Sequence, residues 1–235
     1  MIAGKVAVLL QARLGSQRLP AKVLESIAGA TLLAHCVRRL QSAMVGPMVV
    51  ATTTLPADDA IEAEARRLGV SVFRGSEDDV LGRFVAAAAG AGAEFVVRAT
   101  ADNPAVDPGS AVRLIEALRA ARADHAVEEG LPCGSTVEAV TATALRDAAA
   151  RTTDPADREH VTPYLRRARS GFKCLILAAP AAVRRPDLRF SVDTAADLAY
   201  MRRVLRGGGA TGGRVVPLAD LIAAADRLAA QQEVA

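Results

Sequence analysis

The chain has 235 residues, of which 51% are hydrophobic and only 3% aromatic, and its formal net charge is +3 at pH 7. This length fits one large domain, and it is enough to bury a core without disulfides or metals. No apolar run reaches the ~18 residues of a membrane span, and residues 1–10 are too short, and too soon followed by charge, for a secretory signal. Basic and aromatic residues are not interleaved as in proteins that stack bases. These features argue against a membrane protein and against a nucleic-acid partner.

The cysteines give no sign of a metal site or a disulfide framework. Cys36, Cys133 and Cys174 lie far apart and form no C-x-x-C pair. Scattered reduced thiols are typical of cytoplasmic proteins, so the cytoplasm is the expected location.

Strand-like and helix-like segments alternate through the first half of the chain. Apolar spacing predicts strands at residues 5–10, 48–51, 70–73 and 95–97, and helices at 32–43, 58–68 and 79–89. A further helix should begin at Asp107-Pro108, because Asp caps a helix and Pro suits its first position. This succession is typical of an α/β fold with a mostly parallel sheet covered by helices on both faces.

The alternation loosens after about residue 124. We expect a loop at 129–135, a helix at 158–168, a turn at 207–213 and a final helix at 218–230, with strands at 136–140, at 172–177 and ending at 191–193. Thr194 and Asp197 resemble a capping box that starts one more helix. Since there is no internal repeat and no obvious linker, we expect one domain over residues 1–235 with a smaller lobe at about 125–190.

The most informative segment is residues 6–22, V-A-V-L-L-Q-A-R-L-G-S-Q-R-L-P-A-K, in which a basic turn follows an apolar strand. Gly15 allows the backbone to bend tightly, and successive N–H groups in such a turn can bind an anion. Arg13, Arg18 and Lys22 add the positive charge that a polyphosphate needs. Open α/β sheets bind ligands at the carboxyl ends of their strands. The segment therefore indicates a nucleoside triphosphate site, with an ordinary basic surface loop as the alternative; it is neither a P-loop nor a dinucleotide fingerprint.

Two aspartates also follow strand-like segments. Asp102 lies in R-A-T-A-D-N-P and Asp193 in F-S-V-D-T. Mg²⁺ prefers one or two carboxylates together with phosphate oxygens and water, so the pair could hold one metal ion. The alternatives are an Asp-Asn-Pro turn for Asp102 and a helix-entry cap for Asp193.

Two further polar segments are candidates for substrate contact. A-T-T-T-L-P-A-D-D at 51–59 could line a base pocket or form an ordinary strand-to-helix turn. R-E-H-V-T-P-Y at 158–164 offers Glu159 and His160 to a polar substrate, although a lone histidine near a helix start is often structural. His35 and His125, in a predicted helix and near a predicted strand, are interpreted as structural.

Taken together, these motifs resemble the cytidylyltransferases that activate acidic sugars, such as the CMP-sialic acid and CMP-Kdo synthetases. The closer resemblance is to the SpsF-like cytidylyltransferases. The matching segments Q-A-R-L-G-S-Q-R-L-P-A-K, A-T-T-T-L-P-A-D-D, R-A-T-A-D-N-P and E-H-V-T-P-Y occur in the family's order and span most of the chain. Ala21 and Ala101 depart from the family pattern, because each stands where the family usually has Gly.

The resemblance implies a Rossmann-like, GT-A-like nucleotidyltransferase fold with a small inserted lobe. It implies transfer of CMP from CTP to an acidic sugar, nonulosonic or Kdo-like, with Mg²⁺ as cofactor and release of pyrophosphate, in surface polysaccharide or glycoconjugate biosynthesis. It also implies a homodimer, for which the apolar segment 172–177 is the expected contact because an apolar edge strand needs cover.

The same resemblance assigns roles to individual residues. The catalytic residues would be Arg13, Lys22 and Asp102, and the metal ligands Asp102 and Asp193. The nucleotide would contact Gln11, Ala12, Arg13, Gly15, Ser16, Arg18, Lys22, Ala51, Thr52, Thr53, Arg74, Ser76, Arg98 and Thr100. The acceptor would contact Asn103, Glu138, Glu159 and His160.

Two other functions remain open. The chain could be a nucleotidyltransferase that uses another nucleoside triphosphate, or a phosphonate or sugar-phosphate acceptor. It could also be a non-catalytic nucleotide-binding protein, for which Ala21 and Ala101 are the only support.

Overall fold

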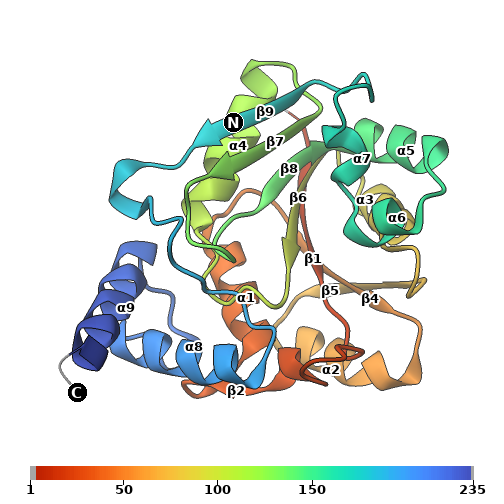
Figure 1. Ribbon diagram of the computed structural model, residues 1–235. Coiled ribbons are helices and arrows are strands. Elements are labelled where there is room, and N and C mark those ends of the chain that lie inside the picture. The colour runs from red at the N-terminus through yellow and green to blue at the C-terminus, as the bar shows by residue number, and fades with distance from the viewer. Residues whose placement is uncertain (1–3, 234–235) are drawn as a thin grey trace.

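The predicted apolar strands form the parallel part of a seven-stranded sheet in the computed structural model, which describes residues 4–233 (Figure 1). The strand order is β5-β4-β1-β6-β8-β7-β9. Only β8 runs antiparallel to its neighbours, β6 and β7. The strands are β1 (Val6–Gln11), β4 (Met48–Thr53), β5 (Ser71–Gly75), β6 (Phe95–Thr100), β7 (His125–Glu129), β8 (Glu138–Thr141) and β9 (Cys174–Ala178), with a separate hairpin of β2 (Ser26–Ile27) and β3 (Ala30–Thr31).

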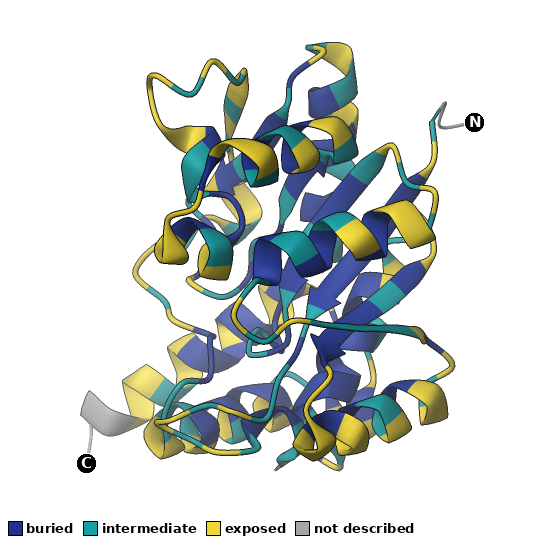
Figure 2. Ribbon diagram, turned by 90° about the vertical axis from the view of Figure 1, so that its right-hand side faces the viewer, coloured by how far each residue is buried: buried dark blue, intermediate teal, exposed yellow. Residues whose placement is uncertain are grey.

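Helices cover both faces of this sheet. Along β1, Val6, Val8 and Leu10 belong to one buried cluster, and Ala7 and Leu9 belong to the other. The first cluster packs against α1 (Leu32–Ser42), α2 (Asp59–Arg67), α4 (Pro108–Ala120), α8 (Ala195–Gly207) and α9 (Leu218–Glu233). The second packs against α3 (Val80–Gly90), α5 (Ala142–Arg151), α6 (Pro155–His160) and α7 (Pro163–Arg166). Figure 2 shows buried strands between helices whose outer faces are exposed.

The chain changes direction across the sheet at β1. It runs outward from β1 to β4 and β5, and then returns to β6 on the other side of β1. A crevice outside the carboxyl ends of two such strands is where open α/β sheets bind ligands. Four short 3₁₀ helices complete the described elements: η1 (Lys22–Leu24), η2 (Pro56–Asp58), η3 (Ala181–Val183) and η4 (Thr211–Gly213).

The predicted α/β architecture with a mostly parallel sheet is confirmed. The Asp107 side chain caps α4, and Thr194 and Asp197 form the predicted capping box of α8. Residues 125–190 supply β7, β8 and β9 to the same sheet and place α5, α6 and α7 on one of its faces. Among the described residues, no helix is both long and apolar enough to cross a membrane.

Two predicted elements are wrong. The helix expected at 158–168 is broken, because α6 ends at His160, Val161 has a positive φ of 73°, and Pro163 starts α7. Pro163 lacks the N–H group that a continuous helix would need there, and it suits the first position of a new helix. The strand expected to end at 191–193 is a loop, held by the bond from the Val192 N–H to the Asp102 carbonyl at 2.8 Å. The sequence interpretation also did not include α5 or the β2-β3 hairpin.

Candidate active site

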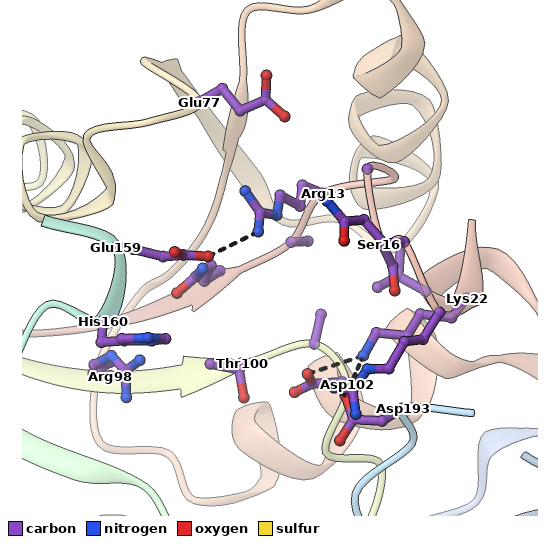
Figure 3. Close-up of a pocket in the computed structure, with 17 residues that line it drawn as sticks. Arg13, Ser16, Lys22, Glu77, Arg98, Thr100, Asp102, Glu159, His160 and Asp193 are labelled. Atoms are coloured by element: carbon purple, nitrogen blue, oxygen red, sulfur yellow. Dashed lines mark hydrogen bonds and ion pairs between the residues drawn. The ribbon is translucent and has the colours of Figure 1, made fainter. Parts of the chain in front are cut away.

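A cavity of about 630 Å³ lies at the carboxyl ends of β1 and β6, where the strand order reverses (Figure 3). Its wall comes mainly from the loop after β1, the end of β6 with the turn that follows, and the end of α6. The predicted site residues that line it are Gln11, Ala12, Arg13, Gly15, Ser16, Arg18, Lys22, Arg98, Thr100, Asp102, Glu159, His160 and Asp193.

The basic loop after β1 is held in place by a buried carboxylate. Asp58, only 2% exposed, accepts a hydrogen bond from the Leu14 N–H at 2.8 Å. The hydroxyl groups of Thr52 and Thr53 donate to the other oxygen of the same carboxylate. Asp58 therefore ties the loop to the end of β4 and fixes the backbone that carries Arg13 and Gly15.

At one end of the cavity, Lys22 joins the two predicted metal ligands (Figure 3). Its Nζ atom donates to Asp102 Oδ2 at 3.1 Å, to Asp193 Oδ1 at 3.1 Å and to the Val192 carbonyl at 2.7 Å. Arg18 and Arg189 also pair with Asp193. Burial alone would raise the pKa of Asp193, but the hydrogen bond and charge of Lys22, with the two arginines, lower it. The Asp193 carboxylate is therefore held in the ionised form that binds cations.

A second ion pair spans the cavity between the loop and α6. Arg13 Nη2 donates to Glu159 Oε1 at 3.0 Å, and both side chains are partly exposed. His160, the last residue of α6, and Arg98 both line the end of the cavity away from Lys22 (Figure 3). Lys22, Asp102 and Asp193 therefore line one end of the cavity. Arg98, Glu159 and His160 line the other end.

Arg98 is held by a chain of buried polar groups. Glu138 does not line the cavity; its carboxylate accepts from Arg98 Nη1 at 2.9 Å and from His125 Nε2 at 2.6 Å. Burial alone would raise the pKa of Glu138, but the hydrogen bond from His125 and the charge of Arg98 outweigh it and lower the pKa to about 2. Glu138, expected to contact the acceptor, is instead placed where it orients Arg98.

Comparison with known proteins agrees with this arrangement. The family model described as "Cytidylyltransferase" matches residues 7–220. The chain belongs to the cytidylyltransferase family. The resemblance inferred from the sequence motifs is therefore confirmed.

Relatives and solved structures extend the match. The chain is 34% identical over 210 residues to the spore coat polysaccharide biosynthesis protein SpsF of Bacillus subtilis, covering 87% of this chain and 88% of that protein. It is 33% identical over 126 residues to a 3-deoxy-manno-octulosonate cytidylyltransferase of Rhodopseudomonas palustris, covering 53% of this chain and 50% of that protein. The structure of a cytidylyltransferase from Leptospira borgpetersenii superposes with a TM-score of 0.87 at 27% identity, covering 97% and 96% of the two chains. A CMP-2-keto-3-deoxy-manno-octonic acid synthetase complexed with CTP shares the fold, with a TM-score of 0.65 at 19% identity and coverage of 86% and 98%.

Ala21 and Ala101, which stand where the family usually has Gly, differ in backbone conformation. Ala21 has φ 56° and ψ 17°, in the left-handed region that favours glycine. Ala101 has no such conformation; it is 2% exposed, and its N–H donates to the Gln11 carbonyl at 2.9 Å. Only Ala21 therefore carries backbone strain.

Several residues expected to contact the nucleotide or acceptor do not line this cavity. Arg74 turns to Asp59 and Glu62 on α2 and to backbone carbonyls of the β4–α2 connection. The remaining predicted site residues outside the cavity wall are Ala51, Thr52, Thr53, Ser76 and Asn103. Of these, Ala51, Thr52 and Thr53 are fully buried, Ser76 accepts from the Asp79 N–H, and the Asn103 amide donates to Thr100.

The two histidines interpreted as structural are both buried. His35 contacts the Ile27 carbonyl at 2.8 Å, and burial lowers the pKa of its imidazole.

Sequence reasoning missed several residues around the cavity. Gln17, Val23, Glu77 and Ala101 line it, and Arg189 pairs with Asp193. Asp58 lies within the segment A-T-T-T-L-P-A-D-D, which was interpreted as a base pocket or an ordinary strand-to-helix turn, with no role in holding the basic loop. Arg189 lies four residues before Asp193, and this spacing is the only sequence signal for their ion pair. The signal is weak, because the two side chains meet only in the particular conformation of this loop.

Proposed function

We propose that this protein transfers CMP from CTP to an acidic sugar, nonulosonic or Kdo-like, and releases pyrophosphate in the biosynthesis of a surface polysaccharide or glycoconjugate. The observation that carries the proposal is the cluster of Lys22, Asp102 and Asp193 beside a basic loop, in a cavity at the carboxyl ends of β1 and β6. The names of the relatives, spore coat polysaccharide biosynthesis protein and 3-deoxy-manno-octulosonate cytidylyltransferase, support the acceptor class and the pathway.

The protein contributes mainly position and charge to this reaction. The backbone of the loop at Gly15 and Ser16, with Arg13 and Arg18, would bind the triphosphate. The acceptor oxygen would then attack the α-phosphorus in line with the departing pyrophosphate. Phosphoryl and nucleotidyl transfers of this kind need alignment and electrostatic stabilisation rather than a covalent nucleophile.

The residues present fit a magnesium ion. Lys22 already places a cation within 3.1 Å of both Asp102 and Asp193, so this is a point where positive charge is stabilised. Two carboxylates, completed by phosphate oxygens and water, make a donor set that suits Mg²⁺. When bound, the ion would help to neutralise the negative charge of the leaving pyrophosphate. Lys22, released from the carboxylates, would then be free to bind phosphate oxygens.

The acceptor would occupy the end of the cavity away from Lys22. Glu159 and His160 line this end, and Arg98 offers a guanidinium group oriented by Glu138. A guanidinium can bind a carboxylate through two parallel hydrogen bonds, which suits a sugar acid. This placement supports an acidic acceptor over a neutral one.

We also propose that the protein forms a homodimer through β9 and acts in the cytoplasm, where CTP is available. β9 is an edge strand of the sheet, and its Ile176 is 66% exposed. The unpaired edge of such a strand is a template for pairing with a second chain, and Ile176 would be buried in that contact.

The test is pyrophosphate release from CTP, UTP, ATP and GTP with Mg²⁺, across sugar acids, phosphonates and sugar phosphates. Release that requires CTP and one sugar acid would support the proposal and identify the acceptor. Release with another nucleotide, or with a phosphonate or sugar phosphate, would contradict the proposal. It would instead indicate a nucleotidyltransferase that uses that nucleotide or acceptor. Nucleotide binding without release for any acceptor would favour a non-catalytic protein.

A further inference from the structure

Arg83 on α3 is a buried arginine whose hydrogen-bonding capacity is only partly used. It is 2% exposed, and its Nη1 atom donates to the Ser76 carbonyl at 2.6 Å. Its Nε and Nη2 atoms are buried and have no hydrogen-bond partner among the described residues. Buried N–H groups are nearly always paired, and a buried charge without partners is costly. The two unpaired donors therefore call for an explanation.

The Arg83 side chain lies just behind the wall of the candidate active site. It packs against Gly75 at the end of β5, where an added Cβ would come within 3.1 Å of the Arg83 Cγ. Its charge interacts with those of Arg13 and Glu77, which both line the cavity, and with that of Asp58. In Figure 3, Arg13 and Glu77 border the side of the cavity opposite Asp102 and Asp193. Arg83 thus lies behind the part of the wall farthest from the predicted metal ligands.

None of the three nearby carboxylates, Asp58, Glu77 and Asp79, accepts a hydrogen bond from Arg83 Nε or Nη2. Both oxygens of Asp58 already accept bonds from the Leu14 and Thr53 N–H groups and from the hydroxyls of Thr52 and Thr53. Burial, followed by the like charge of Arg13, lowers the pKa of Arg83. A ligand that presents two adjacent hydrogen-bond acceptors would satisfy the two donors.

We propose that Arg83 recognises the cytosine ring of CTP, with Nε and Nη2 donating to the cytosine O2 and N3 atoms. These two N–H groups lie on one edge of the planar guanidinium and point in the same direction. Cytosine presents two adjacent acceptors, O2 and N3, to such an edge. Uracil, which has the same size, carries a hydrogen on N3 and would oppose one donor with another. Arginine reads paired base acceptors in the same bidentate way in nucleic-acid complexes.

The Arg83 donors are covered in this structure, so a contact with the base requires a movement of the cavity wall. Arg13 is close enough to Arg83 to repel it, and it is held across the cavity by Glu159. In the proposed complex, the triphosphate would draw the Arg13 guanidinium toward itself and away from Arg83. The inference rests on the proposed function, because it assumes that the cavity binds CTP.

Equilibrium binding of CTP and UTP, without an acceptor, tests this assignment. Wild-type protein is expected to prefer CTP. Arg83→Met should lose about 10- to 100-fold in CTP affinity and much less in UTP affinity, because a bidentate base contact contributes on this scale. Arg83→Lys keeps the charge but not the two-donor edge, so it should lose most of the preference too. Arg66→Met, which removes an exposed arginine of α2, is the matched control and should behave as wild type.

The outcomes separate this inference from the proposed function. Folded Arg83 variants, checked by circular dichroism and pyrophosphate binding, that keep the wild-type ratio of CTP to UTP affinity would overturn the role of Arg83 alone. Equal loss of affinity for the two nucleotides would overturn it as well and indicate a merely structural arginine. Wild-type protein that binds CTP and UTP equally would overturn the proposed function together with this inference. If Arg83→Met does not fold, Arg83→Lys alone decides, because its charge is retained.

Discussion

The Nζ atom of Lys22 donates to Oδ2 of Asp102 at 3.1 Å, although the two residues are 80 positions apart in the chain. The same ammonium group bonds to Asp193, so one cation neutralises two carboxylates that converge from different loops. Without it, the two negative charges would repel each other in a partly buried site. Lys22 thus holds together the groups that we propose to bind Mg²⁺.

Replacing Lys22 by Met should make stability depend on a divalent cation. The variant leaves Asp102 without its cation, while Asp193 keeps Arg18 and Arg189. We expect it to lose on the order of 2 kcal/mol of unfolding free energy in EDTA. Mg²⁺ or Mn²⁺ should restore part of this loss and should stabilise the variant more than wild type, because no ammonium group competes for the carboxylates. Thermal unfolding with and without metal measures the effect, with the exposed Lys5→Met as control. A variant that is insensitive to metal would contradict the proposed ligands.

Replacing Asp102 by Asn should abolish transfer without unfolding the protein. Asn has nearly the same size as Asp but lacks its negative charge. Asp102 needs that charge to pair with Lys22 and to bind a metal ion. We expect pyrophosphate release to fall by at least about 100-fold, the scale typical of lost electrostatic stabilisation, while circular dichroism stays unchanged. Near wild-type turnover would remove Asp102 from the reaction.

Glu138 should contribute pH-dependent stability. Its pKa of about 2 in the folded protein lies below the usual 4.5, so the folded state favours the ionised carboxylate. The resulting stability is fully present above about pH 4.5 and is lost as the pH falls toward 2. Glu138→Gln should be less stable than wild type at pH 7, and the difference should narrow at pH 3. Urea unfolding at both pH values measures this, and the exposed Glu116→Gln should show no such convergence.

Replacing Ile176 by Lys should weaken the proposed dimer. The charge would lie on the exposed edge strand β9, where its burial against a second copy would be costly. Light scattering should show a shift from dimer toward monomer at micromolar concentration. Met44→Lys, at another exposed apolar position that is 87% exposed, should leave the mass unchanged. A wild-type protein that is monomeric under these conditions would exclude the dimer.

The two alanines at glycine positions of the family should respond differently to restoration of glycine. Ala21→Gly should raise stability by about 1 kcal/mol, because the left-handed backbone at φ 56° is strained for alanine. Ala101→Gly should lower it by roughly 0.5–1 kcal/mol, because alanine there is unstrained and glycine adds only entropy to the unfolded chain. Urea unfolding of the two single variants checks both signs. A destabilising Ala21→Gly would show that the strain is already relieved by its neighbours.

Local patterns in the sequence were sufficient to predict the layered α/β fold, the caps of α4 and α8, and the basic loop after β1. Each of these depends on strand periodicity, capping or turn chemistry, which involve residues close together in the chain. The family could be inferred for the same reason, since its motifs are short and continuous. The partners of individual side chains were not accessible in this way. Arg74 pairs with α2, Glu138 lies behind Arg98, and Arg83 of α3 donates to the Ser76 carbonyl. These contacts depend on how the segments pack in three dimensions, which neither periodicity nor motif spacing encodes.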